Sequence, residues 1–332
     1  MNNSLQIILN QVSTVAIGGH LNPDGDATGS CMALYLYLSE YYPDIQVDVY
    51  LENVQTPYLF LKEIDKVKGD IDSSKKYDLF VALDCGDKER LGFLTPLFDN
   101  AKKTFNIDHH ISNQGFADDN YVKPQASSTA ELVYELIAYD RASQQEADSS
   151  KRDSYVPSQA VAEAIYLGIV HDTGVFRYPS TSPQTMEIAA NLIRAGINGP
   201  KIIDETYFEK TFAQTKILGR AIDKARLYLD NVCIASIITQ EDINEFGLTT
   251  HDLDGIINIL KGTAGCHIAI FMYQLDKDKY KVSLRSNEQY NVNIIAAYFG
   301  GGGHIRAAGL TLEGKQPEEI LTALFNEIRK QD

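Results

Sequence analysis

The sequence predicts an α/β protein with two domains, a larger N-terminal parallel-sheet domain and a smaller C-terminal α/β domain, joined by a helical linker. A length of 332 residues suggests two domains, at about 150 residues for each. In the first half, apolar β-branched runs alternate with helical runs, and a similar alternation resumes on a smaller scale after a helical stretch. The expected boundaries are 1–185 for the first domain, 186–228 for the linker and 229–332 for the second domain.

Three apolar runs in the first half are expected to be strands, at 14–18, 78–84 and 103–108. They are apolar on both faces, which is typical of a parallel sheet covered by helices. Helices are expected to follow in the order of the chain. They occupy residues 27–42, 127–139 and 158–171, and the polar stretch Arg141–Asp153 is either a surface loop or a helix extension.

A second, smaller α/β unit is expected after the helical linker. The prolines at 179 and 183 interrupt the pattern, and a helical stretch then continues to about residue 228. The expected strands of this unit are 232–239, 267–274 and 279–284, and the expected helices are 253–260, 292–299 and 317–329.

Composition excludes several classes of protein. Hydrophobic residues make up 44% of the chain, and no apolar run approaches the roughly 18 residues of a membrane span. The N-terminus lacks a secretory signal and the four cysteines are widely separated, which together predict a cytoplasmic protein without a disulfide framework. The net charge of −15 argues against a long nucleic-acid-binding groove, because such a groove needs lysine and arginine side chains to neutralise phosphates.

The first group of candidate ligands follows the expected strand 14–18. His20, Asp24 and Asp26 lie in a turn that contains Pro23 and Gly25. In extended backbone, residues two apart point the same way, so Asp24 and Asp26 are expected to face one pocket. The alternative is an ordinary turn in which Asp26 caps the following helix.

Three further segments end on similar residues. Asp84 ends one strand, His109 and His110 follow another, and Asp172 closes a helix. In parallel sheets, ligands bind beyond the carboxyl ends of the strands. The six candidate metal ligands are His20, Asp24, Asp26, Asp84, His109 and Asp172.

Four carboxylates brought together would repel one another unless cations neutralise them. Two divalent ions would supply that charge, and carboxylate with imidazole suits Mn²⁺, Mg²⁺ or Fe²⁺. A pair of such ions favours displacement at phosphorus, because it stabilises both the attacking and the leaving oxygen. The sequence therefore predicts phosphoester hydrolysis.

A glycine run in the second domain is a candidate anion site. Residues 300–303 are all glycine, so their backbone N–H groups can approach a phosphate closely, and His304 and Arg306 add charge. Arg285 lies on the polar face of an expected strand. Taken alone, the glycine run is better interpreted as a mobile hairpin and Arg285 as a solvated strand residue, whereas beside a metal centre the binding role is favoured for both.

These motifs resemble the DHH phosphoesterase superfamily over nearly the whole chain. Asp108-His109-His110 matches the triplet that names the superfamily, and the motif from His20 to Ser30, Asp84 and Asp172 match the others in order. Arg285-Ser286, the run ending at His304, and residues 307–309 resemble the DHH-associated domain of the branch that contains nano-RNases and pAp phosphatases.

The resemblance implies a metal-binding domain and a substrate-binding domain. His20, Asp24 and Asp84 would hold one Mn²⁺, with Mg²⁺ as the alternative metal. Asp84 would bridge to a second ion, whose other ligands would be Asp26, His109 and Asp172. His110 would contact the scissile phosphate or protonate the leaving oxygen. The groups implied to grip the terminal phosphate or base are Arg285, Ser286, Gly302, Gly303 and His304.

The activities implied are 3′-to-5′ degradation of very short oligoribonucleotides and dephosphorylation of 3′-phosphoadenosine 5′-phosphate (pAp), by a homodimer. Alternatives are a phosphodiesterase of cyclic or linear dinucleotides, a RecJ-like single-strand exonuclease, a pyrophosphatase or exopolyphosphatase, and a non-catalytic nucleotide binder. The net charge and length disfavour the RecJ-like exonuclease, and the glycine run disfavours the pyrophosphatase. The intact ligand set disfavours the binder.

Overall fold

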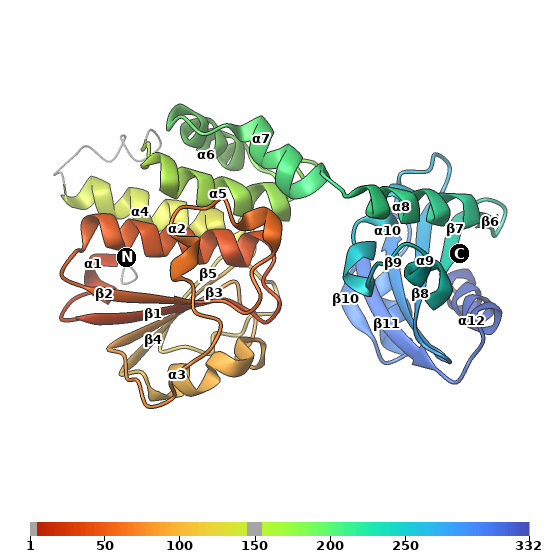
Figure 1. The fold of residues 1–332 in the computed structure, drawn as a ribbon, viewed down its shortest axis with the longest axis horizontal. Helices are drawn as coiled ribbons and strands as arrows, with labels where there is room; N and C mark the ends of the chain where they lie inside the picture. The colour runs from red at the N-terminus through yellow and green to blue at the C-terminus, as the bar shows by residue number, and fades with distance from the viewer. Residues whose placement is uncertain (1–4, 145–154, 332) are drawn as a thin grey trace. The chain divides into compact units, whose positions relative to one another are not determined.

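The computed structural model describes residues 5–144 and 155–331, and divides into two compact units, Met1–Glu209 and Lys210–Asp332. The boundary between them falls inside the segment expected to be a linker. Part of that segment packs with each unit, so each is described by itself (Figure 1). The predicted α/β class is confirmed, with a parallel-sheet unit followed by a smaller α/β unit.

The first unit is built on a five-stranded, entirely parallel sheet. Its strands occur in the order β2-β1-β3-β4-β5. Three of them, β1 (Thr14–Gly18), β3 (Leu79–Leu83) and β4 (Lys103–Asp108), occupy the predicted runs and lie at the centre. The edge strands β2 (Gln46–Tyr50) and β5 (Asp119–Val122) were not predicted.

Helices α2 (Gly25–Tyr41), α4 (Thr129–Gln144) and α5 (Gln159–Asp172) form a layer over one face of this sheet (Figure 1). Val15 and Ile17 of β1 pack under that layer, whereas Ala16 faces the opposite core, which α3 (Thr95–Asn100) and η3 (Glu89–Leu94) cover. Both faces of β1 are therefore buried, which explains why Val15, Ala16 and Ile17 are all apolar. The shorter elements are α1 (Leu5–Ile8), η1 (Thr56–Tyr58), η2 (Ile64–Lys66), α6 (Pro183–Arg194), α7 (Gly199–Ile203) and η5 (Asp204–Phe208).

One local expectation about the first unit needs correction, and one alternative that was left open is decided for the described residues. The stretch from Asp24 to Asp26 was expected to be extended, but α2 begins at Gly25, and the Asp24 carboxylate caps it by accepting from the Asp26 and Ala27 amides. Asp24, not Asp26, is therefore the N-cap. The polar stretch from Arg141 extends α4 as far as Gln144, and residues 145–153 lie outside the described part of the chain.

The second unit contains a six-stranded mixed sheet in the order β10-β11-β9-β8-β7-β6. Only β7 (Cys233–Ile238) and β8 (Ile268–Asp276) pair in parallel. The other strands are β6 (Arg226–Tyr228), β9 (Lys279–Ser286), β10 (Gly302–His304) and β11 (Ala307–Glu313). The second half of the glycine run is therefore an edge strand and not a free loop.

Each face of this second sheet has its own core. The helices α11 (Val292–Tyr298) and α12 (Pro317–Arg329) pack on one face. On the other face lie α8 (Phe212–Lys224), α9 (Gln240–Glu245), η6 (Thr250–Leu253) and α10 (Ile256–Lys261). None of the helices within residues 5–144 and 155–331 is both long enough and apolar enough to cross a membrane.

Candidate metal centre

Six predicted ligands come together at the carboxyl edge of the parallel sheet. Asp84 directly follows β3, and His109 directly follows β4. His20 lies just beyond β1, and Asp172 is the last residue of α5. Asp24 and Asp26 belong to the start of α2, so the ligands arrive from three strand ends and two helix ends.

His20 forms one side of the cluster with Asp24 and Asp84. Its Nε2 lies 3.4 Å from Asp84 Oδ2 and 3.7 Å from Asp24 Oδ1. The Nδ1 atom lies 2.8 Å from the carbonyl oxygen of Leu21, which can only accept, so Nδ1 carries the hydrogen. This hydrogen bond directs Nε2 to the two carboxylates.

His109 forms the other side with Asp26 and Asp172. Its Nε2 lies 2.9 Å from Asp172 Oδ2 and 3.9 Å from Asp26 Oδ2. The donor atoms of this trio lie within 4.8 Å of one another, as do those of the trio containing His20, Asp24 and Asp84. Each trio has the size of a ligand set for one ion.

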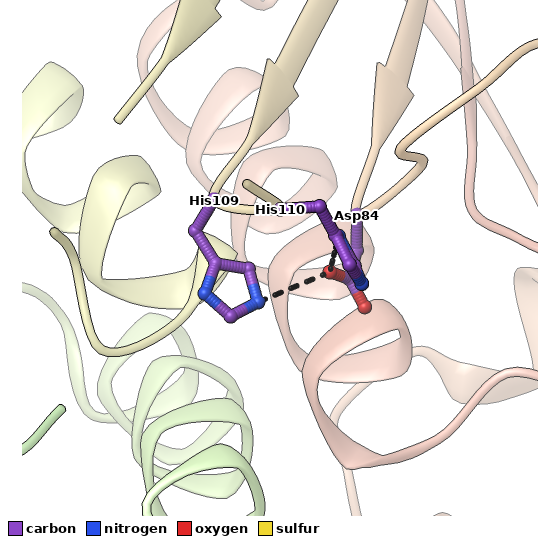
Figure 2. A group of neighbouring side chains, drawn as sticks. All are labelled: Asp84, His109 and His110. Atoms are coloured by element: carbon purple, nitrogen blue, oxygen red, sulfur yellow. Dashed lines mark ion pairs between the residues drawn. The ribbon is translucent and has the colours of Figure 1, made fainter. Parts of the chain in front are cut away.

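Asp84 lies between the two sides. Its Oδ1 is 3.7 Å from His109 Nε2 and 3.6 Å from His110 Nδ1 (Figure 2). The other carboxylate oxygen, Oδ2, faces His20. The Asp84 residue is 2% exposed, and its backbone adopts φ of 56°. A left-handed backbone is uncommon outside glycine, although Asp tolerates it better than most residues. The chain therefore accepts local strain at the residue that links the two trios.

The cluster holds more negative charge than it can neutralise by itself. Burial raises the pKa of Asp26 well above its ordinary value, and repulsion from Asp84 and Asp172 raises it further. Burial lowers the pKa of His20 and of His109, but the hydrogen bonds and charges of their carboxylate partners outweigh this and raise both to about 10. Without metal, protons on Asp26, His20 and His109 reduce the negative charge of the cluster, and bound cations could replace these protons. The nitrogen and oxygen donors fit a divalent ion such as Mn²⁺ or Mg²⁺.

His110 also lies beside Asp84 and His109, and its donor atoms form a third close group with theirs, but its hydrogen bond is to a residue outside the six ligands. Its Nδ1 donates to Asp108 Oδ1 at 2.7 Å, and this hydrogen bond raises its pKa. Asn113 in turn donates to the other Asp108 oxygen at 2.7 Å. The ring is thereby fixed through Nδ1 and leaves Nε2 for another partner.

The second unit places the remaining candidates at one end of its sheet. Arg285 of β9 lies opposite Ala307 of β11. On its other side, β11 pairs with β10, which consists of Gly302, Gly303 and His304. His304 is exposed. The Ser286 side chain alternates to the opposite side of β9 from Arg285, and its hydroxyl donates to the carbonyl of Tyr290 at 2.7 Å.

No role was predicted for three residues of the site, although one of them, Asp108, belongs to the triplet quoted from the sequence. Asp108 and Asn113 hold His110, and Thr129 contacts two of the clustered carboxylates. A sequence signal existed for Thr129, because Ser128-x-x-Glu131 has the form of a helix-capping motif and places Thr129 in the first turn. Its neighbours in space, however, depend on how the helices pack.

Comparison with known proteins agrees with this geometry. Residues 14–169 match the DHH family, N-terminal domain, and residues 229–330 match the DHHA1 domain. The chain belongs to the DHH family. It is accordingly a DHH phosphoesterase, a metal-dependent hydrolase.

Relatives of this DHH phosphoesterase include two proteins named bifunctional oligoribonuclease and PAP phosphatase NrnA. The protein from Bacillus subtilis is 27% identical over 90% of this chain and 89% of its own length. The protein from Thermus thermophilus is 26% identical over 96% and 90%, respectively. A crystal structure of an exopolyphosphatase-related protein from Bacteroides fragilis matches with a TM-score of 0.84, at 24% identity, and covers 97% of this chain and 95% of that one. The last likeness concerns the fold alone.

Proposed function

We propose that this DHH phosphoesterase degrades very short oligoribonucleotides from the 3′ end and dephosphorylates pAp, using two divalent metal ions. The observation that carries the proposal is the cluster in which Asp84, a member of one donor trio with His20 and Asp24, also faces His109 of the other trio. The names of the relatives from Bacillus subtilis and Thermus thermophilus support the choice of substrates.

His20, Asp24 and Asp84 would hold one ion, and Asp26, His109 and Asp172 would hold the other together with Asp84. Mn²⁺ is the proposed metal, because imidazole and carboxylate are both among its ligands. When bound, the ions would lower the pKa of a water and neutralise charge on the phosphate. Asp84 would contribute one oxygen to each side, since its two oxygens face different histidines.

His110 would act on the phosphate or on the leaving oxygen. Asp108 accepts from its Nδ1, which leaves Nε2 to donate a proton to an oxygen. The raised pKa of His110 keeps the ring protonated over more of the neutral range, as a proton donor requires. Asn113 holds Asp108 and therefore fixes the direction of this donor.

The second unit would bind the end of the substrate. Arg285 would supply a permanent positive charge, and His304 with the exposed edge strand β10 would supply further donors to phosphate. Ser286 would contribute as an acceptor or through its backbone, because its hydroxyl hydrogen is directed at Tyr290.

A short substrate also agrees with the net negative charge of the protein. The net charge of −15 does not suit a long electrostatic groove. We further infer that the protein acts in the cytoplasm, because its four cysteines are free thiols and all are buried.

The decisive experiment measures Mn²⁺-dependent hydrolysis of 5′-labelled RNAs from two to about two dozen nucleotides, a range that spans the ~4–16 nucleotides of strand-binding grooves. In parallel, pAp, pyrophosphate and cyclic and linear dinucleotides are offered. We expect the highest rates on the shortest RNAs and turnover of pAp. Rates that increase with length, or hydrolysis of pyrophosphate alone, would contradict the proposed substrates. Preference for one dinucleotide would favour the dinucleotide phosphodiesterase.

A further inference from the structure

Thr129, the first residue of α4, contacts two of the clustered carboxylates at the same time. Its hydroxyl donates to Asp84 Oδ1 at 3.1 Å, and its backbone amide donates to Asp26 Oδ2 at 2.6 Å. The next amide, that of Ala130, donates to Asp26 Oδ1 at 2.9 Å. The Thr129 side chain is completely buried, so water cannot replace it in these contacts.

These hydrogen bonds orient the two carboxylates and still leave lone pairs on their oxygens for a metal ion. The first amides of a helix have no partner within the helix, and a carboxylate at this end also gains from the helix dipole. Each oxygen of Asp26 accepts one amide and keeps a second lone pair for a cation. Similarly, Asp84 Oδ1 keeps a lone pair after accepting from the Thr129 hydroxyl.

The first turn of α4 is itself held rigidly by groups that do not contact the cluster. The Ser128 hydroxyl accepts from the amide of Glu131 at 3.1 Å and caps the helix. The Glu131 carboxylate accepts from the hydroxyls of Ser127, at 2.5 Å, and Thr185, at 2.7 Å. Thr129 is therefore supported at a defined position.

We propose that Thr129 is a positioning residue that aligns Asp26 and Asp84 for divalent metal binding. The inference rests on the metal centre of the proposed function. Hydrogen bonds to metal ligands orient the ligands, and their loss typically weakens metal binding by about 10–100-fold. Thr129 acts on one ligand from each side of the cluster, so its effect should extend to the whole centre.

The test compares the Mn²⁺ affinity of the natural protein with that of variants at Thr129. Affinity is measured by titration calorimetry and, independently, from the electron paramagnetic resonance signal of free Mn²⁺. Thr129→Val keeps the backbone amide and the size of the side chain but removes the hydroxyl. We expect it to weaken Mn²⁺ binding about 10-fold or more. Thr129→Ser keeps the hydroxyl and should restore affinity to within about twofold of the natural protein. If Thr129→Val does not fold, Thr129→Ala takes its place with the same expectation.

Thr104→Val is the matched control. Thr104 is also buried and also donates its hydroxyl to a carboxylate, that of Asp118 at 2.9 Å, but it forms no hydrogen bond to the six ligands or to the groups that hold the first turn of α4. We expect this variant to lose thermal stability and to keep its Mn²⁺ affinity. Unchanged affinity in Thr129→Val, or an equal loss in Thr104→Val, would overturn the positioning role while leaving the metal centre intact. Absence of Mn²⁺ binding by the natural protein would overturn the metal centre and the inference together.

Discussion

Gly168 of α5 lies so close to Asp26 that a Cβ atom at position 168 would be 2.7 Å from Asp26 Oδ1. It would also lie 2.5 Å from the Cβ of Ala130, in the turn that donates to Asp26. Asp26 is therefore confined between two helices, by the amides of α4 and by the bare backbone of α5.

We expect Gly168→Ala to lower the free energy of unfolding by about 1–3 kcal/mol, as overpacking does elsewhere, and to weaken Mn²⁺ binding. Gly219→Ala is the control, because Gly219 is also in a helix but a Cβ there would meet no atom within 4 Å. Without a clash, this change should stabilise the protein by about 0.5–1 kcal/mol. Urea unfolding and Mn²⁺ titration check both variants, and equal behaviour of the two would refute the confinement of Asp26.

Asp84→Asn should remove nearly all hydrolysis. Asn keeps the shape and tolerates the left-handed backbone, but it lacks the negative charge that both sides of the cluster share. Loss of a hydrogen-bond partner of a metal ligand typically lowers activity by about 10–100-fold, and loss of the ligand itself should have a larger effect. We therefore expect activity below about one hundredth of that of the natural protein. Circular dichroism establishes that the variant is folded, and near-normal turnover would contradict the role of Asp84 in the centre.

Arg285→Ala should weaken substrate binding with little effect on turnover at saturation. Loss of a charged hydrogen bond costs about 1.5–3 kcal/mol, so the Michaelis constant for a dinucleotide should rise by about 10–100-fold. Arg226→Ala changes an arginine in β6, which is the edge strand at the other side of the sheet from β10. This variant should leave the Michaelis constant unchanged. A lower kcat with an unchanged constant in Arg285→Ala would assign Arg285 to the chemical step.

Metal binding should strengthen as pH rises. His20 and His109 have pKa values of about 10 without metal, so both are protonated at pH 7 and must release a proton to become ligands. Mn²⁺ affinity should therefore increase from pH 6 towards pH 9, with proton release. Calorimetry in two buffers with different ionisation enthalpies counts these protons, and binding at pH 7 without proton release would contradict the assignment of both histidines.

Stability of the metal-free protein should have the opposite pH dependence. The pKa of each histidine is higher in the folded chain than its ordinary value of 6.5. Their ion pairs therefore stabilise the fold fully below pH 6.5, and this contribution decreases as pH rises towards 10. Urea unfolding with a chelator present, at pH 6 and pH 9, should show the decrease, which His20→Gln should reduce.

The central strands and the site could be predicted because both depend on simple patterns. β1 and β3 are buried on both faces and almost wholly apolar, and β4 is buried after its first residue although it carries Thr104 and Asn106. Parallel strands bring their carboxyl ends to one edge, so polar residues at these ends predicted the site. β2 is buried only in its second half and carries Asp48 there, and β5 is a short edge strand without a fully buried residue. Their sequences do not resemble buried strands.

The contacts of Thr129 could not be predicted, because they depend on tertiary packing. Residues 26 and 129 are far apart in the sequence, and only the packing of α2 and α4 brings them together. The expected extended backbone from Asp24 to Asp26 was wrong for a related reason, because Asp24 itself is extended but the helix begins at the next residue. The same carboxylate can cap a helix or face a pocket, and the side chain of Asp24 does both.

The strand order β2-β1-β3-β4-β5 also has a consequence for how the protein reaches its native state. Every pairing in this sheet is parallel, so each requires a long connection to close first, and such topologies fold slowly. The six ligands span positions 20 to 172 and are not neighbours until β1, β3, β4 and α5 have all assembled. Capture of metal would then be a late event in refolding, and its time course would report the completion of the sheet.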